Sequence, residues 1–263
     1  MQRMTLFFSL ILIVTISCQT KKPLNANEHL VMATLYQQTA AEYRALCYQA
    51  YNLGKWRLAA MLDTLNSAKK PAIVIDIDET VLDNSPYEAY LIKTNLFYPA
   101  GWQQWLTAAQ AKPVPGALDF LTWADQKGVD IFYVSNRKEE SKAYTLQNLK
   151  KFGFPQVKQN HLFLRTTTSS KVARRKAIQK THTILLLFGD NLNDFAQIFE
   201  HQSIVDRFKA VDQLKEEFGK RFIVLPNAMY GEWEGAIYNY QWRADPKTKG
   251  QMRLKALRPF NEN

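Results

Sequence analysis

Short apolar runs alternate with longer amphipathic segments along most of this chain. The runs are rich in β-branched and aromatic residues, which predicts buried strands at residues 73–75, 129–134, 161–164, 183–188 and 221–225. Apolar residues recur at helical spacing between most of these runs, at residues 116–126, 141–152, 169–181 and 211–218. Strands that alternate with helices predict an α/β fold, in which helices cover both faces of a parallel sheet.

Two regions lie outside this alternation. Residues 29–68 show helical spacing without proline and predict two N-terminal helices, with a break at Asn52, Leu53 and Gly54. Residues 83–115 are rich in tyrosine, phenylalanine and tryptophan and separate the first strand from the next predicted helix. Because this insertion directly follows the end of a strand, we expect a mainly α-helical cap that overhangs the same edge of the sheet.

The first residues predict export. Arg3 precedes an apolar run over residues 6–16, about half of the ~20 residues that a membrane-spanning helix needs. Ser17 and Cys18 resemble a bacterial lipoprotein processing site, which predicts a signal peptide at residues 1–17, a lipidated Cys18 and a polar tether through residue 28. The alternative is an ordinary secretory signal that is cleaved nearby. A lipid on Cys18 would anchor the protein on the periplasmic or cell-surface side of a membrane, and we expect the outer membrane.

The charge of the chain narrows the classes of partner. The formal net charge of +10 falls to +9 once the segment with Arg3 is removed, which suits phosphorylated substrates or anionic lipid. Basic residues cluster at 171–176 and 247–258, but no DNA-reading motif accompanies them, so we expect no nucleic-acid partner. If Cys18 carries lipid, Cys47 has no partner for a disulfide, and its helical surroundings predict a small core residue.

Two carboxylates follow the first predicted strand. The run Ile73–Ile75 leads into Asp76, Ile77 and Asp78, at the end of a strand where open α/β sheets bind ligands. Neighbouring side chains leave a strand on opposite faces, so two acids one residue apart fit best where the backbone begins to turn. There Asp76 can act as a nucleophile and a metal ligand, while Asp78 can handle a proton. The apolar run before them favours a phosphoryl-transfer site over a solvated turn.

Polar residues at three later positions can complete such a site. Ser135 and Asn136 follow a predicted strand and can present donors to a phosphate oxygen at the same sheet edge. Lys171 stands at the start of a predicted helix, where a cation could neutralise a phosphoryl group. Asp190 and Asp194 follow the strand predicted at 183–188, and acids at this spacing can converge on a divalent cation. Each feature taken alone is also typical of an ordinary loop.

The order of these groups resembles the haloacid dehalogenase (HAD) superfamily of phosphohydrolases. More narrowly, residues 76–85 (DIDETVLDNS) and 189–195 (GDNLNDF) resemble the paired signatures of the class C acid phosphatases, bacterial lipoproteins and secreted enzymes that act as 5′-nucleotidases. The resemblance extends from about residue 28 to the C-terminus, with Asn193 standing where an acid is common. It implies a HAD-like, Rossmann-type sheet in a phosphatase domain that covers residues 29–263.

The resemblance also implies a role for each carboxylate. Asp76 would attack phosphorus and form an aspartyl-phosphate, and Asp78 would protonate the leaving oxygen and then deprotonate the hydrolytic water. One Mg²⁺ would be held by the Asp76 carboxylate, the Asp78 backbone carbonyl and Asp190, with Asp194 binding the ion or lying beside it. We therefore expect a phosphoric monoester hydrolase that depends on this cation.

Substrate contacts follow from the same resemblance. Ser135, Asn136 and Lys171 would bind the phosphoryl oxygens, while Trp102 and Tyr230 would surround a nucleobase or nicotinamide ring. We expect hydrolysis of nucleoside 5′-monophosphates, nicotinamide mononucleotide among them, and the resemblance implies a homodimer. Two alternatives remain open, namely a phosphatase for sugar phosphates and other small esters, and a surface ligand-binding lipoprotein without catalysis. A receiver domain would need neither a proton donor at position 78 nor the aromatic insertion.

Overall fold

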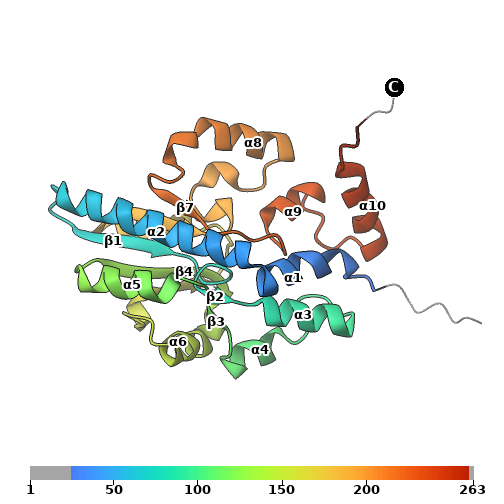
Figure 1. Cartoon of the computed structure of the whole chain (residues 1–263), viewed down its shortest axis with the longest axis horizontal. Coiled ribbons are helices and arrows are strands. Elements are labelled where there is room, and N and C mark those ends of the chain that lie inside the picture. The colour runs from blue at the N-terminus through green and yellow to red at the C-terminus, as the bar shows by residue number, and fades with distance from the viewer. Residues whose placement is uncertain (1–24, 261–263) are drawn as a thin grey trace, which may run out of the picture.

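The computed structural model describes residues 25–260 and has a five-stranded parallel sheet at its centre (Figure 1). The strand order is β5-β4-β1-β6-β7. The strands are β1 (Lys70–Ile75), β4 (Asp130–Lys138), β5 (Leu162–Arg165), β6 (His182–Gly189) and β7 (Phe222–Val224). The α/β prediction is confirmed, because each predicted apolar run is a strand of this parallel sheet.

Alternate residues of the central strands face opposite sides of the sheet. On one side Ile73 and Ile75 belong to a core shared with α2 (Ala41–Asp63), α5 (Ala117–Gln126) and α6 (Lys142–Lys151). On the other side Ala72 and Val74 pack in a second core with Ile178 of α7 (Val172–Gln179). Both faces of β1 are therefore buried, which explains why its sequence is a continuous apolar run and not an alternating one.

The N-terminal helices differ from the prediction. A 3₁₀ turn (Glu28–Leu30) leads into α1 (Val31–Thr39), and α2 follows after one extended residue, Ala40, with ψ of 126°. The predicted break at Asn52, Leu53 and Gly54 was wrong, because α2 runs through it without interruption. Gly54 is required there by packing, since a Cβ at this position would lie 2.5 Å from the ring of Phe188.

The helix predicted at 211–218 was also wrong. The helix in this region is α8 (Ile204–Gln213), and a 3₁₀ turn (Lys215–Glu217) follows it. Ser203 starts α8 by accepting a hydrogen bond from the backbone N–H of Asp206 at 3.2 Å. The apolar spacing after Val211 therefore belongs to the end of a helix and a turn, and the N-capping serine was the better signal for the boundary.

The insertion after β1 is mainly α-helical, as predicted. A short antiparallel pair, β2 (Leu82–Asp83) and β3 (Lys112–Pro113), closes its base. Between these strands lie α3 (Ser85–Thr94) and α4 (Trp102–Ala108). These helices lie beyond the end of β1 and form the cap of the molecule, with α3 beside α1 and α4 beside α6 (Figure 1).

The remaining elements are short. They are four 3₁₀ turns (Glu139–Ser141, Gln159–His161, Leu192–Asp194 and Gln197–Phe199) and two helices, α9 (Glu232–Ile237) and α10 (Pro246–Ala256). None of the helices in residues 25–260 combines the length and apolar composition that crossing a membrane requires. Cys47 is fully buried in the core, as predicted. The predicted signal peptide and Cys18 lie outside the described residues.

Candidate active site

The carboxyl ends of β1 and β6 bring the predicted carboxylates together. The two strands are paired through Ile75 and Phe188, and the backbone N–H of Asp76 donates to the carbonyl of Phe188 at 3.0 Å. Asp76 thus leaves the end of β1 beside Gly189 and Asp190, which leave the end of β6. Main-chain pairing between neighbouring strands therefore sets the distance between residues that are far apart in the sequence.

Lys171 lies between two of these carboxylates. Its ammonium group pairs with Asp76 and, at 2.6 Å, with Oδ1 of Asp194. All three side chains are less than 10% exposed. Burial opposes the charge on the lysine, but Asp194 and Asp76 raise the pKa of Lys171 above its ordinary value. The lysine is therefore a permanent cation next to Asp76.

Asp76, Asp190 and Asp194 form a cluster with the composition of a cation site. Each offers a carboxylate oxygen, and these atoms all lie within 4.8 Å of one another. Burial raises the pKa of Asp76 to about 7, although Lys171 acts in the opposite direction. Burial and the charges of Asp194 and Asp76 raise the pKa of Asp190 as well. One lysine does not offset three carboxylates, and an all-oxygen donor set suits a hard divalent cation.

Neighbouring groups fix the two carboxylates that follow β6. Asn227 donates to Oδ2 of Asp190 at 2.8 Å. Asp194 is the third residue of a capping box, in which its Oδ2 accepts from the backbone N–H of Asn191 at 3.1 Å. Gly189 leaves the space for this arrangement, because a Cβ there would lie 2.3 Å from Oδ2 of Asp194.

Asp78 has surroundings unlike those of Asp76. Its side chain is 20% exposed, whereas Ile77 between the two acids is fully buried. Arg137 holds it with a fork of hydrogen bonds, from Nε to Oδ1 at 3.0 Å and from Nη2 to Oδ1 at 2.8 Å. Ser135 donates to Oδ2 at 3.2 Å, and Asn84 donates to Oδ1 at 2.8 Å. Asp78 is thus oriented on the solvent side of the site, apart from the buried acid cluster.

Ser135 and Asn136 point to different surroundings. Ser135 is fully buried and faces Asp78, as described above. Asn136 is exposed, and its Oδ1 accepts from Nη2 of Arg174 at 2.7 Å. Arg174 also donates through Nη1 to the backbone carbonyl of Ser135 at 2.6 Å. Arg174 therefore connects α7 to the end of β4 beside the site, a role that its place in a basic cluster did not reveal.

Tyr230 is connected to the site by a hydrogen bond to Glu79. Its hydroxyl donates to Oε2 of Glu79, a carboxylate that is fully buried and whose backbone has a positive φ of 59°. Asn84 donates to the same carboxylate from its backbone N–H at 2.7 Å and from its side chain at 3.1 Å. Burial, Asp78 and Asp190 raise the pKa of Glu79. Glu79 therefore links the loop that carries Tyr230 to the turn that carries Asp78.

Trp102 approaches the site from the cap. The guanidinium of Arg137 lies over its ring, 5.7 Å from the centroid, so one arginine contacts both Trp102 and Asp78. The ring of Tyr87 meets it edge-on at 4.9 Å. Trp102 is thus partly a packing residue of the cap, but it also touches the group that orients Asp78.

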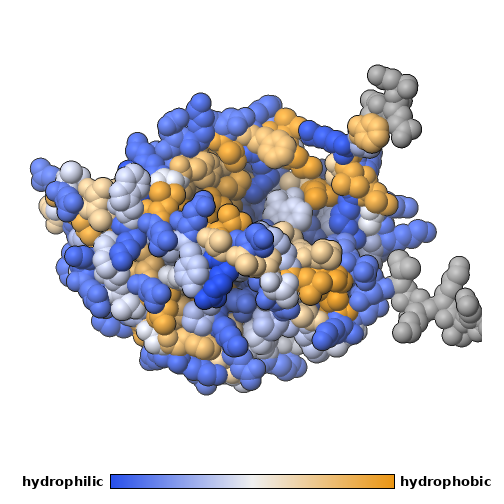
Figure 2. Space-filling model, in the orientation of Figure 1, coloured by the Kyte–Doolittle hydropathy of each residue, from blue (hydrophilic) through white to orange (hydrophobic). Residues whose placement is uncertain are grey.

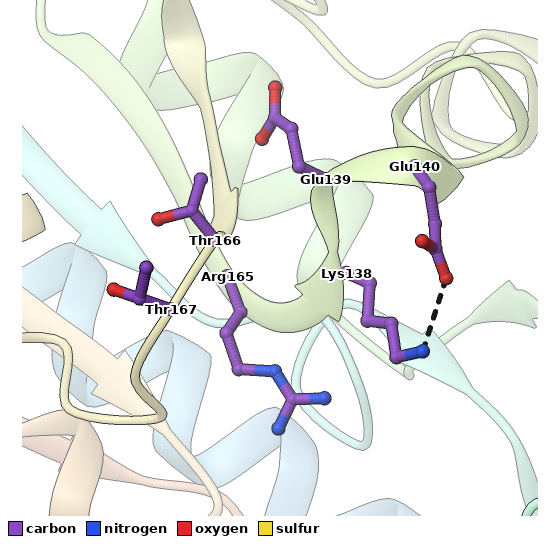
Figure 3. A pocket seen from close by; sticks show the side chains of 6 residues that line it. All are labelled: Lys138, Glu139, Glu140, Arg165, Thr166 and Thr167. Carbon is purple, nitrogen blue, oxygen red and sulfur yellow. Dashed lines mark hydrogen bonds and ion pairs between the residues drawn. The ribbon is translucent and has the colours of Figure 1, made fainter.

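A separate hollow of about 430 Å³ flanks the site at the ends of β4 and β5 (Figure 3). Lys138, Glu139 and Glu140 line it from the end of β4, and Arg165, Thr166 and Thr167 line it from the end of β5 and the loop after it. Lys138 pairs with Glu140 at 3.2 Å. The charges of its two cations and two carboxylates cancel, so this hollow attracts an anionic substrate less strongly than the region around Lys171 does.

Sequence reasoning missed three groups of the site. Arg174, Glu79 and Asn84 all make hydrogen bonds within it, as described above. Glu79 and Asn84 stand inside the DIDETVLDNS motif, so their position in the motif was an available signal.

Comparisons with known proteins identify the family of this chain. Residues 14–233 match the family model described as HAD superfamily, subfamily IIIB (acid phosphatase). A solved structure of the class C acid phosphatase from Bacillus anthracis superposes with a TM-score of 0.88 at 44% identity, covering 90% of this chain and 100% of that one. A structure of the same protein with tungstate bound gives the same values. A soybean (Glycine max) stem 31 kDa glycoprotein is 27% identical over 164 residues, which are 60% of this chain and 58% of the soybean protein.

Proposed function

Because this chain belongs to the acid phosphatases of HAD subfamily IIIB, we propose that it hydrolyses nucleoside 5′-monophosphates through an aspartyl-phosphate intermediate. One observation carries the proposal. Asp76 is buried against Lys171, while Asp78, two residues away, is partly exposed and held by Arg137. Two carboxylates in unlike surroundings suit two different roles, a nucleophile and a proton carrier.

The first step transfers the phosphoryl group to the protein. A carboxylate oxygen of Asp76 attacks phosphorus, and the bond from phosphorus to the ester oxygen breaks. Asp78 donates its proton to that oxygen, so that the nucleoside leaves as a neutral alcohol. Lys171 neutralises the transferring oxygens, and the Ser135 hydroxyl lies close enough to Asp78 to donate to the same group.

The second step restores the carboxylate. Asp78, now deprotonated, takes a proton from a water molecule whose oxygen attacks the phosphorus of the aspartyl-phosphate. The acyl-phosphate bond breaks, inorganic phosphate leaves, and Asp76 returns to its initial state. The fork from Arg137 keeps Asp78 in one orientation for both proton transfers.

The acid cluster fits Mg²⁺, which is the cation we propose. Asp76, Asp190 and Asp194 would hold it, together with the backbone carbonyl of Asp78. When bound, the ion would offset the repulsion between an anionic nucleophile and an anionic substrate. Burial, with a smaller effect of neighbouring carboxylates, raises the pKa values of Asp76 and Asp190, so a cation bound there would stabilise their charged forms.

The aromatic cap supports a substrate that carries a ring. We assign Trp102 and Tyr230 to the nucleobase or nicotinamide ring, since stacking on an aromatic side chain contributes ~1–3 kcal/mol per base and tolerates different bases. The contacts of the two rings support this assignment. Trp102 contacts Arg137, which holds Asp78, and Tyr230 contacts Glu79, which follows Asp78 in the sequence. Nicotinamide mononucleotide belongs to the same class of substrate.

The test is phosphate release by the mature chain, residues 18–263 with Cys18→Ser, from AMP, nicotinamide mononucleotide and glucose 6-phosphate. We expect release from both nucleotides with Mg²⁺, none with EDTA and none from Asp76→Asn. Asp206→Asn on the exposed side of α8 is the matched control and should behave as the wild type. Turnover of the sugar phosphate alone would favour the small-ester phosphatase, and no turnover at all would favour a ligand-binding protein.

The aromatic assignment needs its own variant. Trp102→Leu should raise KM for AMP about tenfold and leave KM for glucose 6-phosphate unchanged. Trp56→Leu is the matched control, because Trp56 is 66% exposed on α2, away from the cap. An equal loss for both substrates would identify Trp102 as a packing residue only.

We also propose that the enzyme is an exported, lipid-anchored homodimer. The Ser17–Cys18 junction supports lipidation on the outer-membrane side. Expression of Cys18→Ala in a bacterial host should move the enzyme from the membrane fraction to the soluble fraction. Analytical ultracentrifugation of the soluble form measures its oligomeric state, and a monomer would contradict the dimer.

A further inference from the structure

The C-terminal segment carries a large share of the positive charge of the chain. Residues 243–258 contain six cations and one acid, a net charge of +5 within a chain of formal net charge +10. The cations are Arg243, Lys247, Lys249, Arg253, Lys255 and Arg258. The active site described above uses none of them.

The same segment exposes large apolar side chains. Trp242, Leu254, Leu257 and Phe260 are 44%, 71%, 67% and 81% exposed. Helix α10 has no buried residue, and Figure 2 shows orange and blue side chains side by side in this region. Apolar and cationic groups therefore alternate on one surface, residues 242–260, which we call the C-terminal face.

Only one side of α10 contacts the rest of the protein. Lys249 and Arg253 lie over the ring of Tyr238 at 5.3 and 5.9 Å, and Nη1 of Arg253 donates to the Tyr238 hydroxyl at 2.6 Å. These two cations attach the helix to α9. Leu254 and Leu257 make no part of this contact, so their exposure is not offset by packing within the described residues.

The C-terminal face lies at the end of the molecule where the described chain begins. Helix α10 and the start of α1 lie side by side at one end of Figure 1. Burial, together with the charges of Arg253 and Lys249, lowers the pKa of His29 to about 4, which is consistent with this proximity. The predicted export signal and Cys18 precede His29 by a short stretch of sequence.

We propose that the C-terminal face docks on an anionic lipid surface. Its cations would approach the headgroups, and Leu254, Leu257 and Phe260 would enter the boundary between headgroups and acyl chains. Lys249 and Arg253 are held against Tyr238, so the cations available to the headgroups are the other four, Arg243, Lys247, Lys255 and Arg258. This contact is additional to the proposed lipid on Cys18 and independent of the reaction at Asp76.

The mixture of groups favours lipid over other polyanions. A nucleic acid would pair with the cations but would leave three exposed aliphatic and aromatic side chains in water. An acidic protein would also pair with the cations, but α10 has no buried residue that would shape a complementary protein interface. A lipid surface accepts both kinds of side chain at once, because it is charged outside and apolar beneath.

The experiment measures co-sedimentation with vesicles, using the mature chain, residues 18–263, with Cys18→Ser so that no lipid is attached. One vesicle is phosphatidylcholine alone and the other also contains phosphatidylglycerol. We expect binding to the anionic vesicle only, and its loss in high salt. Absence of binding to the anionic vesicle, equal binding to both vesicles, or tighter binding to duplex DNA than to the anionic vesicle would overturn the proposal.

Two triple variants test the face itself, each with a matched control at exposed positions elsewhere. The charge variant is K247Q, K255Q and R258Q, and its control is K127Q, K150Q and K158Q. The apolar variant is L254S, L257S and F260S, and its control is W56S, V205S and F208S. We expect each variant to bind at least about tenfold more weakly and each control to bind as the wild type.

If a variant and its control weakened vesicle binding equally, the effect would come from overall charge or hydrophobicity and not from the C-terminal face. That result would overturn the proposal. Circular dichroism of every variant establishes folding without reference to catalysis. Failure of the proposed phosphatase activity and failure of membrane docking are therefore separate results.

Discussion

Replacing Gly54 by alanine should destabilise the protein, although Gly54 lies in the middle of a helix. In most helices this change stabilises, because alanine exceeds glycine by ~1 kcal/mol in helix propensity. Here the new Cβ would lie 2.5 and 2.7 Å from two carbons of the Phe188 ring. Contacts this short require one of the two groups to move.

The Phe188 ring has little freedom to move away. It is 1% exposed, and the rings of Tyr51 and Phe120 pack against it at 5.7 and 4.8 Å. Overpacking of this kind costs ~1–3 kcal/mol, which exceeds the gain in helix propensity. Subtracting the gain in helix propensity leaves an expected net loss of up to about 2 kcal/mol in the free energy of unfolding.

The displacement should also reach the active site. The carbonyl of Phe188 accepts from the N–H of Asp76, and Asp190 follows two residues later. A shift of a few tenths of an ångström in Phe188 moves both ends of the acid cluster, so we expect kcat to fall severalfold with KM little changed.

The assay is urea unfolding followed by circular dichroism, with Gly250→Ala as the matched control. Gly250 lies inside α10, and the nearest atom to its Cβ position is a distal nitrogen of Arg253 at 3.8 Å. We therefore expect Gly250→Ala to stabilise by ~0.5–1 kcal/mol. If Gly54→Ala stabilised by the same amount, the packing argument for the uninterrupted α2 would be refuted.

Three further substitutions have defined outcomes. Burial raises the pKa of Glu88 from 4.5 to about 7. The folded state therefore binds this proton more tightly than the unfolded state, and stability falls as the pH rises through this range. Glu88→Gln should increase the free energy of unfolding in urea by on the order of 2 kcal/mol above pH 7 and leave it unchanged near pH 4. Arg137→Lys keeps the charge but loses the fork on Asp78, so steady-state kinetics with AMP should show kcat reduced by about ten- to a hundredfold, and an unchanged kcat would contradict the role of Arg137. Gly189→Ala would displace Asp194 and weaken Mg²⁺ binding by about tenfold or more in isothermal titration calorimetry, and wild-type affinity would remove Asp194 from the cation site.

The sheet and the main carboxylates could be predicted from sequence because their signals are local. A strand buried on both faces is a continuous apolar run, and the residues directly after it lie at the sheet edge. Asp76 and Asp190 follow such runs, so the strand order alone brings them together. The family resemblance added the order of the groups, and the comparisons confirmed that family.

The continuity of α2 through Gly54 and the contact of Arg137 with Asp78 could not be predicted locally. Whether a glycine ends a helix or accepts a neighbour depends on what packs against it, and Phe188 comes from a distant strand. Arg137 is separated from Asp78 by 59 residues, so no spacing rule links them. Such pairs are decided by tertiary contacts, which a pattern of apolar and polar positions does not record.

If the N-terminus is tethered as proposed above, the first described residues give the cap a mechanical role. Asn25 donates to the carbonyl of Ile92 at 2.8 Å, and the buried Asn27 donates to the carbonyl of Leu96 at 2.6 Å. In a protein tethered by its N-terminus, a pull on the tether would load these bonds first. The force would act on the end of α3. The cap, which carries Trp102, would therefore be displaced before the strand that leads to Asp76.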